Sequence, residues 1–346
     1  MTDRVSVIMT VFNGERYLRQ AVDSILAQTF DGFELLIVDD ASSDSTPEIL
    51  ATLAAGDARI RILRNETNLG PYPSANRALE VACAPIIVRM DADDVSTPGR
   101  IARQLAFLDA NPDHLLVSSS YLAMDEEGRT LYTKRKSADN ACAQWLLRFR
   151  MCFEHPGSCF RAYLPNGEPV RYDESHAVAQ DYELFSRLAL AGKVAILPEV
   201  LFHYRVHASN ITSTRKKEQK TNALRIAQAA QRRAYPPETV EALGPPMRSY
   251  MLEAPAEPAG FRAMVVAFDY IVLQAVAQNP KQKTWYVRQT AEIMAHAILR
   301  NGGAMRNPVK VLLFAFHARR YLPALLMRVL ENKRLLPTWL ESFPDV

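Results

Sequence analysis

Short apolar runs alternate with amphipathic stretches along the first 121 residues of the chain. Each apolar run has the length of a β-strand, and each amphipathic stretch has the spacing of apolar positions that is typical of a helix. The apolar runs predict strands at residues 5–11, 33–38, 60–63, 86–90 and 115–121. The stretches between them predict helices at residues 17–28, 46–55, 74–83 and 99–109. Repeated strand-helix-strand units predict an α/β fold, in which helices flank a mixed, mostly parallel sheet.

The alternation weakens after residue 122. A charged stretch predicts a hairpin at residues 125–136, and later patterns predict helices at 141–150 and 181–191 and strands at 194–197 and 201–204. From residue 212 the chain becomes polar, and proline pairs then separate further helical patterns, at residues 224–234, 261–278, 285–299 and 309–330. We therefore predict an α/β domain at residues 1–211, with parts 1–121 and 122–211, and a helical region at 212–346.

The composition is that of an ordinary folded protein, with 48% hydrophobic and 23% charged residues. The four cysteines form no C-x-x-C pair, which favours reduced thiols in a cytoplasmic protein and argues against zinc. The apolar run at the N-terminus is too short for a signal peptide, and no uncharged run approaches the ~20 residues needed to cross a bilayer. We expect a cytoplasmic location.

Charge is divided unevenly along the chain. Residues 1–210 contain 21 Lys and Arg against 28 Asp and Glu, whereas residues 211–346 contain 20 against 10, so the net charges are −7 and +10. In the predicted helix at 309–330, one face carries Lys310, His317, Arg320 and Arg328 beside a wide apolar surface. This pattern fits peripheral contact with the anionic inner face of a membrane. The alternative for the helix, which we favour, is a core helix packed on its neighbours, and the alternative for the basic charge is a solvated helical face.

Acidic residues follow two of the predicted strands and open one predicted helix. Asp39 and Asp40 come after the second strand, the Asp91 to Asp94 cluster comes after the fourth, and Asp181 begins the helix at 181–191. The carboxyl ends of parallel strands meet at one edge of a sheet, where ligands bind. Because hard cations prefer oxygen ligands, this edge predicts a site for a divalent cation and a diphosphate.

Several motifs occur together in a fixed order. They are residues 5–13, the run 36–46, Asn68-Leu69-Gly70 with Asn76, Met90-Asp91-Ala92-Asp93-Asp94, His155-Pro156-Gly157-Ser158, Gln180-Asp181-Tyr182-Glu183 and Tyr204-Arg205-Val206-His207. In this order and spacing, the chain resembles family 2 glycosyltransferases of the inverting GT-A type over roughly residues 4–210. The resemblance implies a GT-A fold, that is, a Rossmann-like nucleotide-diphospho-sugar transferase fold. Residues 1–121 would then bind the nucleotide, and residues 122–211 would face the acceptor.

The resemblance makes Asp91-Ala92-Asp93 the D-x-D motif that holds Mn2+ or Mg2+ on the donor diphosphate. It implies that Asp93 is the principal metal ligand, with Asp91 close to the metal or the ribose and Asp94 in support. The alternative is an Asp-rich turn that caps the helix after Pro98.

Further residues of the donor site follow from the same resemblance. Asp39 would accept the imide N–H of uracil, and Asp40 would support that loop or the ribose; the alternative for both is an ordinary capped turn. The remaining donor-binding candidates lie on neighbouring loops, and they are Thr10, Phe12, Asn13, Asn68, Asn76 and Ala92. Thr10 departs from the family, which usually has proline there.

The resemblance also implies residues for the chemistry itself. Asp181 aligns with the catalytic base, although a carboxylate at a helix start is also a plausible cap. His207 would be a late metal ligand and Arg205 would contact phosphate oxygens; a lone histidine is more often structural. His155-Pro156-Gly157-Ser158 would line the acceptor side, and the same residues simply mark a turn. Arg215, Lys216 and Lys217 would close over the diphosphate or form a solvated run.

These expectations describe a metal-dependent, inverting glycosyltransferase (hexosyltransferase type). It would use a nucleotide sugar, with UDP favoured by Asp39, and a glycan or lipid-linked acceptor in bacterial surface polysaccharide, lipopolysaccharide or glycolipid synthesis, with no nucleic acid partner. Two alternatives are a non-catalytic nucleotide-sugar binding protein and a haloacid-dehalogenase-type phosphatase with Asp91 as nucleophile. The phosphatase needs a second acidic pair downstream, and the later aspartates are isolated.

Overall fold

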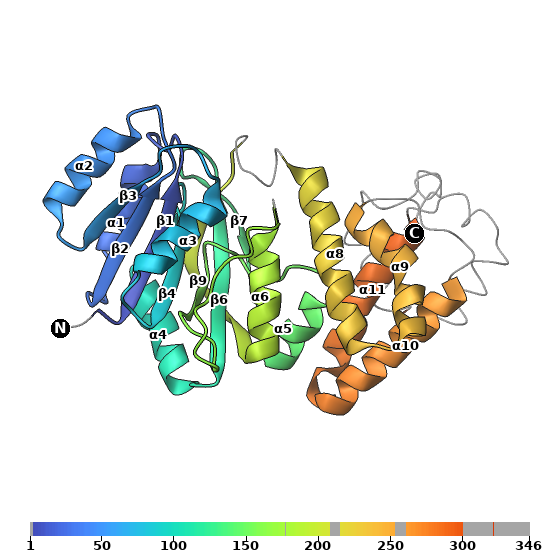
Figure 1. Cartoon of the computed structure of the whole chain (residues 1–346). Helices are drawn as coiled ribbons and strands as arrows, with labels where there is room; N and C mark the ends of the chain where they lie inside the picture. The colour runs from blue at the N-terminus through green and yellow to red at the C-terminus, as the bar shows by residue number, and fades with distance from the viewer. Residues whose placement is uncertain (1–2, 177, 208–214, 253–260, 300–320, 322–346) are drawn as a thin grey trace. The chain divides into compact units, whose positions relative to one another are not determined.

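The computed structural model describes residues 3–176, 178–207, 215–252, 261–299 and Tyr321. Contacts within the chain divide it into two units (Figure 1). The α/β unit comprises residues 1–144 and 152–215, and the helical unit comprises residues 145–151 and 216–346. The later division lies close to the boundary expected at residue 211. The grouping of residues 145–151 with the helical unit is a feature that the sequence pattern did not predict.

One sheet organises the α/β unit. Within the described residues it has nine strands, in the order β3-β2-β1-β4-β8-β6-β9-β5, with β7 paired to β6. The bounds are β1 Val5–Val11, β2 Phe33–Asp39, β3 Ile60–Arg64, β4 Ile86–Asp91, β5 Val95–Ser96, β6 His114–Met124, β7 Thr130–Lys134, β8 Cys159–Arg161 and β9 Lys193–Arg205. Strands β1 to β4 are parallel to one another, while β8 runs antiparallel to β4 and β6. The predicted mixed, mostly parallel sheet is confirmed.

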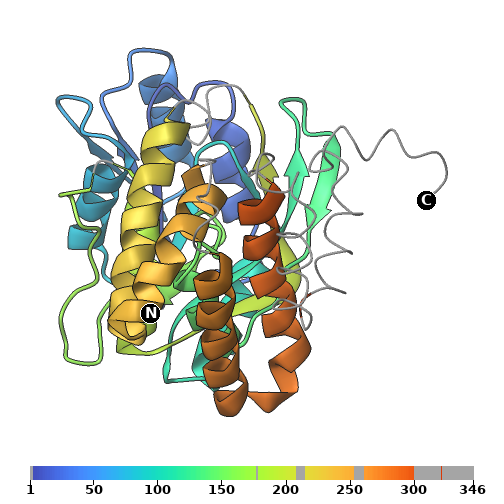
Figure 2. The same cartoon turned by 90° about the vertical axis from the view of Figure 1, so that its right-hand side faces the viewer.

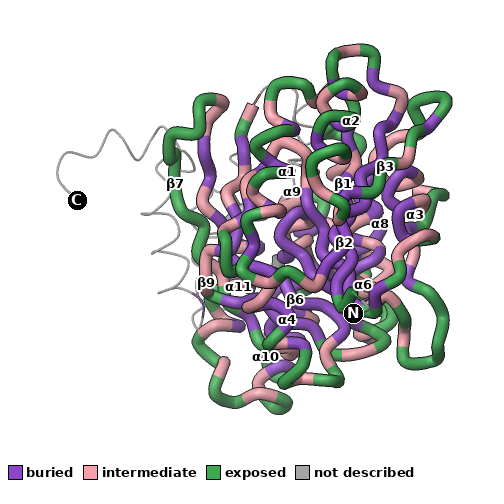
Figure 3. The backbone as a smooth tube through the Cα atoms, turned by 90° about the vertical axis from the view of Figure 1, so that its left-hand side faces the viewer, coloured by how far each residue is buried: buried purple, intermediate pink, exposed green. Residues whose placement is uncertain are grey.

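The helices of this unit follow the predicted strand-helix alternation. Their bounds are α1 Leu18–Leu26, α2 Thr46–Gly56, α3 Pro71–Val81, α4 Arg100–Ala110, α5 Asn140–Leu147 and α6 Gln180–Ala191. The last residues of α5, from Trp145 on, belong to the helical unit. Strands β1 and β2 are almost wholly buried, as the purple segments of Figure 3 show, because helices pack on the sheet. Their apolar side chains form one cluster with those of α1, α2 and α4. This core fixes the strand ends on which the candidate site is built.

Two details of the sheet differ from the pattern-based expectation, and a third agrees with it. A single strand, β9, spans residues that predicted two separate strands. The short strands β5 and β8 were not predicted, because two or three residues are too few to show a period of two. The charged hairpin was predicted, and its second strand, β7, is exposed throughout.

The helical unit contains four α-helices within the described residues, which Figure 2 shows packed against one another. They are α8 Lys216–Ala234, α9 Pro237–Leu252, α10 Phe261–Gln278 and α11 Lys283–Leu299. Pro245 and Pro246 lie inside α9, although the sequence pattern placed a break there. The φ angle of proline is compatible with a helix, so the cost is lost backbone hydrogen bonds and a local clash, which packing offsets here. The predicted helix at 309–330 lies outside the described residues, Tyr321 excepted.

Residues 145–151 belong to the core of the helical unit. The Trp145 ring lies 5.8 Å from the Trp285 ring and 5.8 Å from the Tyr286 ring, measured between centroids. Arg150 donates hydrogen bonds to the Tyr250 hydroxyl at 2.8 Å and to Glu292 Oε1 at 2.9 Å.

Among the described helices, none is both long and apolar enough to span a membrane.

Candidate active site

The loops that follow β1 and β2 are tied together at the carboxyl edge of the sheet. The Asn13 N–H donates to Ser42 Oγ at 2.9 Å, and Asn13 Oδ1 accepts the Ser43 N–H at 2.9 Å. The Gly14 N–H donates to Thr46 Oγ1 at 2.8 Å. Asn13 has a φ of 50°, a left-handed conformation that asparagine tolerates better than most residues. Asn13 therefore fixes the rim of the site through its side chain and its turn.

Asp39 ends β2 with its carboxylate almost completely buried, at 1% exposure. Its Oδ1 accepts the Ser42 N–H at 3.0 Å, and the Arg64 Nε lies 3.4 Å from Oδ2. Within the described residues, Oδ2 accepts no hydrogen bond. A buried acceptor without a donor is costly, so this oxygen is suited to accept a hydrogen bond from a ligand.

Asp40 has a different environment, although it is the next residue. Its Oδ1 accepts hydrogen bonds from Asn65 Nδ2 at 2.6 Å and the Leu69 N–H at 2.8 Å, and its Oδ2 accepts the Gly70 N–H at 2.8 Å. Gly70 has a φ of 92°, which favours glycine. Of the two roles expected for Asp40, this geometry fits the support of a loop, and Asn65 is a partner that the sequence did not indicate.

Three other donor-binding candidates differ in how far they are exposed to solvent. Phe12 is 51% exposed on the loop after β1, and Asn68 is exposed on the loop before α3. Asn76 is buried instead, and its amide is hydrogen-bonded to the backbone of Tyr172 and to Glu174 Oε1. The structure therefore gives Asn76 contacts with another loop of the protein.

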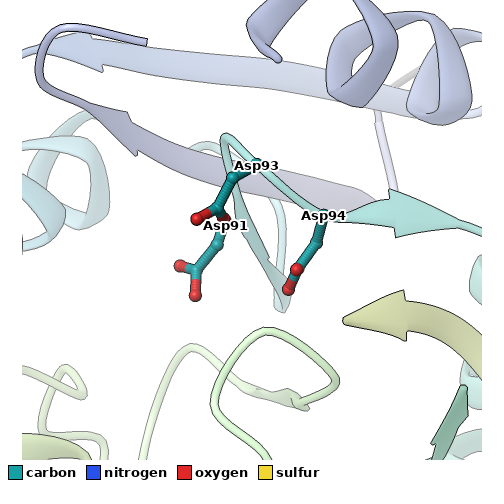
Figure 4. A group of neighbouring side chains, drawn as sticks. All are labelled: Asp91, Asp93 and Asp94. Atoms are coloured by element: carbon teal, nitrogen blue, oxygen red, sulfur yellow. The ribbon is translucent and has the colours of Figure 1, made fainter. Parts of the chain in front are cut away.

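Three carboxylates cluster on the turn after β4. Ligand oxygens of Asp91, Asp93 and Asp94 lie within 4.8 Å of one another, and the side chains project toward the same side of the turn (Figure 4). Asp94 Oδ1 accepts the Arg205 N–H at 2.8 Å, whereas its buried Oδ2 has no hydrogen-bond partner among the described residues. Burial, followed by the charges of Asp93 and Asp91, raises the pKa of Asp94 well above its usual value. Carboxylates that lie this close together repel one another. A divalent cation bound among their oxygens would offset that repulsion, so the cluster fits a cation site.

His207 lies beside this cluster. Its Nε2 is 2.8 Å from Asp93 Oδ2, and its ring centroid is 5.5 Å from that of Tyr17. The metal-ligand role expected for His207 stays a prediction, and this contact is compatible with it.

Arg205 is placed differently from the expectation that it contacts phosphate. Its side chain is buried, Nε donates to the Asp93 backbone carbonyl at 2.8 Å, and Nη2 donates to Gln20 Oε1 at 2.6 Å. Nη1 donates to the backbone carbonyls of Asp125 and Glu126. Because its guanidinium already donates to acceptors of the protein, Arg205 stabilises the acidic turn through these hydrogen bonds.

Arg89 is a charged residue of the site that motif reasoning missed. It is 2% exposed within β4, and its Nη2 lies 2.8 Å from Asp91 Oδ1 and 2.9 Å from Thr10 Oγ1. The parallel register sets Thr10 beside Asp91, so these three groups meet. The available signal was a single arginine in an otherwise apolar strand, because a buried charge requires a partner.

Asp181 lies in the first turn of α6, after Ala179 with its left-handed φ of 63°. Its Oδ1 accepts the Tyr182 N–H at 2.9 Å. Burial is the main cause that raises the pKa of Asp181 to about 6; the hydrogen bond from the Tyr182 N–H lowers it, and the charge of Asp91 raises it further. Because the charge of Asp91 acts on Asp181, these two carboxylates belong to the same region of the molecule.

Aromatic side chains occupy the side that was predicted to face the acceptor. His155 Nε2 lies 2.7 Å from the Tyr172 hydroxyl, and burial lowers the pKa of His155 well below its usual value. A side chain at Gly157 would meet the Phe202 ring at 2.3 Å, which explains the glycine in this motif.

The sheet order and the cluster of carboxylates on its carboxyl edge are those expected of a GT-A glycosyltransferase. Residues 6–164 match the model of "Glycosyl transferase family 2". An uncharacterized glycosyltransferase of Haemophilus influenzae is 30% identical over 231 residues, which cover 64% of this chain and 71% of the relative. The chain therefore belongs to glycosyltransferase family 2, and the phosphatase interpretation is not supported.

Other similarities agree with this assignment. The amylovoran biosynthesis glycosyltransferase AmsE of Erwinia amylovora is 27% identical over 215 residues, 61% of this chain and 79% of the relative. The crystal structure of S. aureus TarS 1-349 in complex with UDP-GlcNAc superposes with a TM-score of 0.59 at 16% identity, covering 88% of this chain and 92% of that chain. The mannosyltransferase PcManGT from Pyrobaculum calidifontis, in complex with GDP-Man and Mn2+, gives a TM-score of 0.52 at 18% identity over 96% and 88% of the two chains. These two likenesses confirm the predicted GT-A fold.

Proposed function

We propose that this protein is a metal-dependent, inverting glycosyltransferase of the hexosyltransferase type that transfers a sugar from UDP to a hydroxyl of a glycan or lipid-linked acceptor. The observation that carries the proposal is the cluster of Asp91, Asp93 and Asp94 on the turn after β4, whose ligand oxygens lie within 4.8 Å of one another, with His207 beside Asp93. Sugar transfer needs the leaving diphosphate and the incoming hydroxyl at one carbon atom. The proximity of a cation-binding turn and a separate carboxylate meets that need.

The acidic turn supplies the residues for the cation. Asp93 and Asp91 would bind Mn2+ or Mg2+ through carboxylate oxygens, with Asp94 in support and His207 as a further ligand close to Asp93. A bound divalent cation would offset the charge that develops on the departing diphosphate. The buried positive charge of Arg89, which contacts Asp91, holds that carboxylate in place.

Asp39 favours uracil as the base. Its buried Oδ2 accepts no hydrogen bond within the described residues and is free to accept one from a ligand. The N3–H of uracil is a donor, whereas cytosine has an acceptor at the same position. Guanine also presents an N–H on this edge, so a GDP-sugar is the alternative donor. TarS was solved with UDP-GlcNAc and PcManGT with GDP-Man, and both have this fold.

Asp181 acts in this proposal as the general base. It would accept the proton of the acceptor hydroxyl while that oxygen attacks the anomeric carbon on the face opposite the nucleotide, which inverts the configuration. A pKa raised to about 6 leaves the carboxylate mostly ionised at neutral pH while making it a stronger base than an ordinary aspartate.

The proposal also covers the class of acceptor and the location of the enzyme in the cell. AmsE is named for amylovoran biosynthesis, and an acceptor in bacterial surface polysaccharide or glycolipid synthesis is consistent with that relative. We place the enzyme in the cytoplasm, with the basic region 212–346 in peripheral contact with the inner face of the membrane. Flotation of the full chain and of a chain lacking residues 305–346 on anionic liposomes tests that contact, and equal partitioning would remove it.

A thermal-shift panel tests the donor and its cation. The panel pairs UDP-, GDP- and CDP-sugars with and without MnCl2, because a ligand that binds the native state raises its melting temperature. We expect stabilisation by a UDP-sugar only in the presence of Mn2+, and its loss in Asp93→Asn. Asp109→Asn is the matched control, since Asp109 is an exposed partner of Arg4. Equal stabilisation without the cation would contradict the proposed role of the acidic turn.

A further inference from the structure

Tyr17 lies on the loop between β1 and α1, at the residue that precedes the helix. Its ring contacts two side chains from the end of β9, far away in the sequence. The Arg205 guanidinium carbon lies 4.4 Å from the centre of the ring, and the His207 ring lies 5.5 Å away, measured between centroids. The Tyr17 hydroxyl forms no hydrogen bond within the described residues, so the flat ring makes these contacts.

Both neighbours of Tyr17 also contact the acidic turn that follows β4. His207 Nε2 lies 2.8 Å from Asp93 Oδ2. Arg205 donates its backbone N–H to Asp94 Oδ1 and its Nε to the Asp93 carbonyl, both at 2.8 Å. Tyr17 therefore packs on the segment that holds the candidate cation ligands together.

The Arg205 side chain fixes the Tyr17 ring on one side. Arg205 is 1% exposed, and its Nη2 donates to Gln20 Oε1 at 2.6 Å, one turn along α1 from Tyr17. Its Nη1 donates to the backbone carbonyls of Asp125 and Glu126. A guanidinium above an aromatic face is attracted by the negative face of the ring. The position of the Tyr17 ring is thus set by a partner that is itself held by the protein.

His207 lies two residues beyond the end of β9, outside the hydrogen-bonded strand. Its ring contacts Tyr17 at an interplanar angle of 35°, while its Nε2 faces Asp93. An imidazole binds a metal through one ring nitrogen, so the orientation of the ring decides whether that nitrogen reaches the cation. Residues that orient a metal ligand contribute strongly to metal affinity without touching the metal.

We propose that Tyr17 is a positioning residue that orients the His207 imidazole toward a cation bound at Asp93. This role depends on the proposed function, in which the transfer needs a divalent cation and His207 is one of its ligands. The start of α1 thereby helps to assemble a cation site whose proposed ligands come from the acidic turn and the end of β9.

Substitutions at Tyr17 separate the ring from its hydroxyl. Tyr17→Phe keeps the ring, whereas Tyr17→Leu removes it, and Tyr17→Met removes it while a flexible side chain fills more of the space. Tyr163→Leu is the matched control, because Tyr163 is an exposed tyrosine of the same unit. The melting temperature of each variant shows that it is folded under the conditions of the assay.

Pulsed EPR on the full-length protein with UDP and MnCl2 detects the coupling between Mn2+ and the nitrogen of a bound imidazole. We expect this coupling in the parent, Tyr17→Phe and Tyr163→Leu, its absence in His207→Ala, and its weakening in Tyr17→Leu and Tyr17→Met. By calorimetry, the MnCl2 concentration that half-saturates UDP binding should rise about tenfold in Tyr17→Leu. The same substitution should have no further effect in a His207→Ala background, because the two residues act on one ligand.

Full nitrogen coupling in folded Tyr17→Leu and Tyr17→Met overturns the role of Tyr17. Weaker UDP binding in Tyr17→Phe also overturns it, because the hydroxyl would then contact the donor. If the parent needs Mn2+ to bind UDP but shows no nitrogen coupling, the metal dependence stands, and the roles of His207 and Tyr17 both fail. If the parent binds UDP equally well without Mn2+, the proposed metal dependence itself fails.

Discussion

Charged side chains in the two units differ in how fully the protein itself satisfies them. In the helical unit, the Arg150 guanidinium donates to Glu292 Oε1 at 2.9 Å and to Gln289 Oε1 at 2.5 Å. In the α/β unit, Asp39 and Asp94 each bury one carboxylate oxygen that accepts no hydrogen bond within the described residues. Unpaired buried groups are costly and are retained where a ligand completes them. A carboxylate oxygen without a hydrogen bond within the described residues distinguishes Asp39 and Asp94 of the candidate site from the hydrogen-bonded Arg150 of the helical unit.

The largest expected effect of a substitution is the loss of sugar transfer when Asp181, the proposed general base, is replaced. Asp181→Asn should reduce sugar transfer by roughly a thousandfold, because loss of a general base removes two to four orders of magnitude. Binding of UDP with Mn2+ should be retained. Nucleotide release from the donor found by the thermal-shift panel measures the first, and calorimetry the second. Transfer at the parental rate would show that another group takes the proton.

The second prediction concerns adjacent residues with different partners. Asp39→Asn should weaken UDP binding by roughly tenfold to a hundredfold, because the change removes a charged acceptor, with little effect on the melting temperature. Asp40→Asn should instead lower the melting temperature, because Asp40 accepts hydrogen bonds from Asn65, Leu69 and Gly70. Calorimetry and thermal unfolding on both variants distinguish the two roles. The same profile in both variants would remove the contrast.

The third prediction is a pH dependence. Because burial raises the pKa of Asp181 to about 6, the base becomes protonated as the pH falls through that value. Below it, kcat/KM should fall tenfold for each pH unit, about two units before an ordinary aspartate would titrate. The same shift makes the native state bind a proton more tightly than the unfolded chain, so this group contributes stability as the pH falls from about 6 toward about 4. A rate profile that stays flat down to pH 5 would contradict the assignment.

The smallest effect on donor chemistry is expected in the helical unit. Arg150→Met should destabilise the protein by roughly 1 to 2 kcal/mol, since Arg150 is 32% exposed and its partner Glu292 loses a charged contact. UDP affinity should remain unchanged. Urea unfolding and calorimetry measure these two quantities. A fall in affinity as large as that of Asp39→Asn would show that the helical unit takes part in donor binding.

Motifs were informative where function depends on neighbours along the chain. The acidic turn at 91–94 and Asp39 lie at strand ends that apolar periodicity located, and the α/β fold followed from the same pattern. Arg89 escaped notice because its role comes from a partner far away in sequence, Thr10. The prolines inside α9 show a related difficulty, since packing overrides a local signal that normally ends a helix.

Residues 145–151 affect how truncated proteins and chimeras of this family should be designed. Trp145 and Phe149 are almost fully buried, and Phe149 contacts the rings of Tyr235 and Phe268. The polypeptide thus passes into the helical unit, returns, and passes into it again after Arg215. In a shortened protein that ends near residue 211, the Trp145 and Phe149 rings would be exposed to solvent, and the exposed apolar surface would favour aggregation. Chimeras should therefore transplant this heptapeptide together with the C-terminal helices.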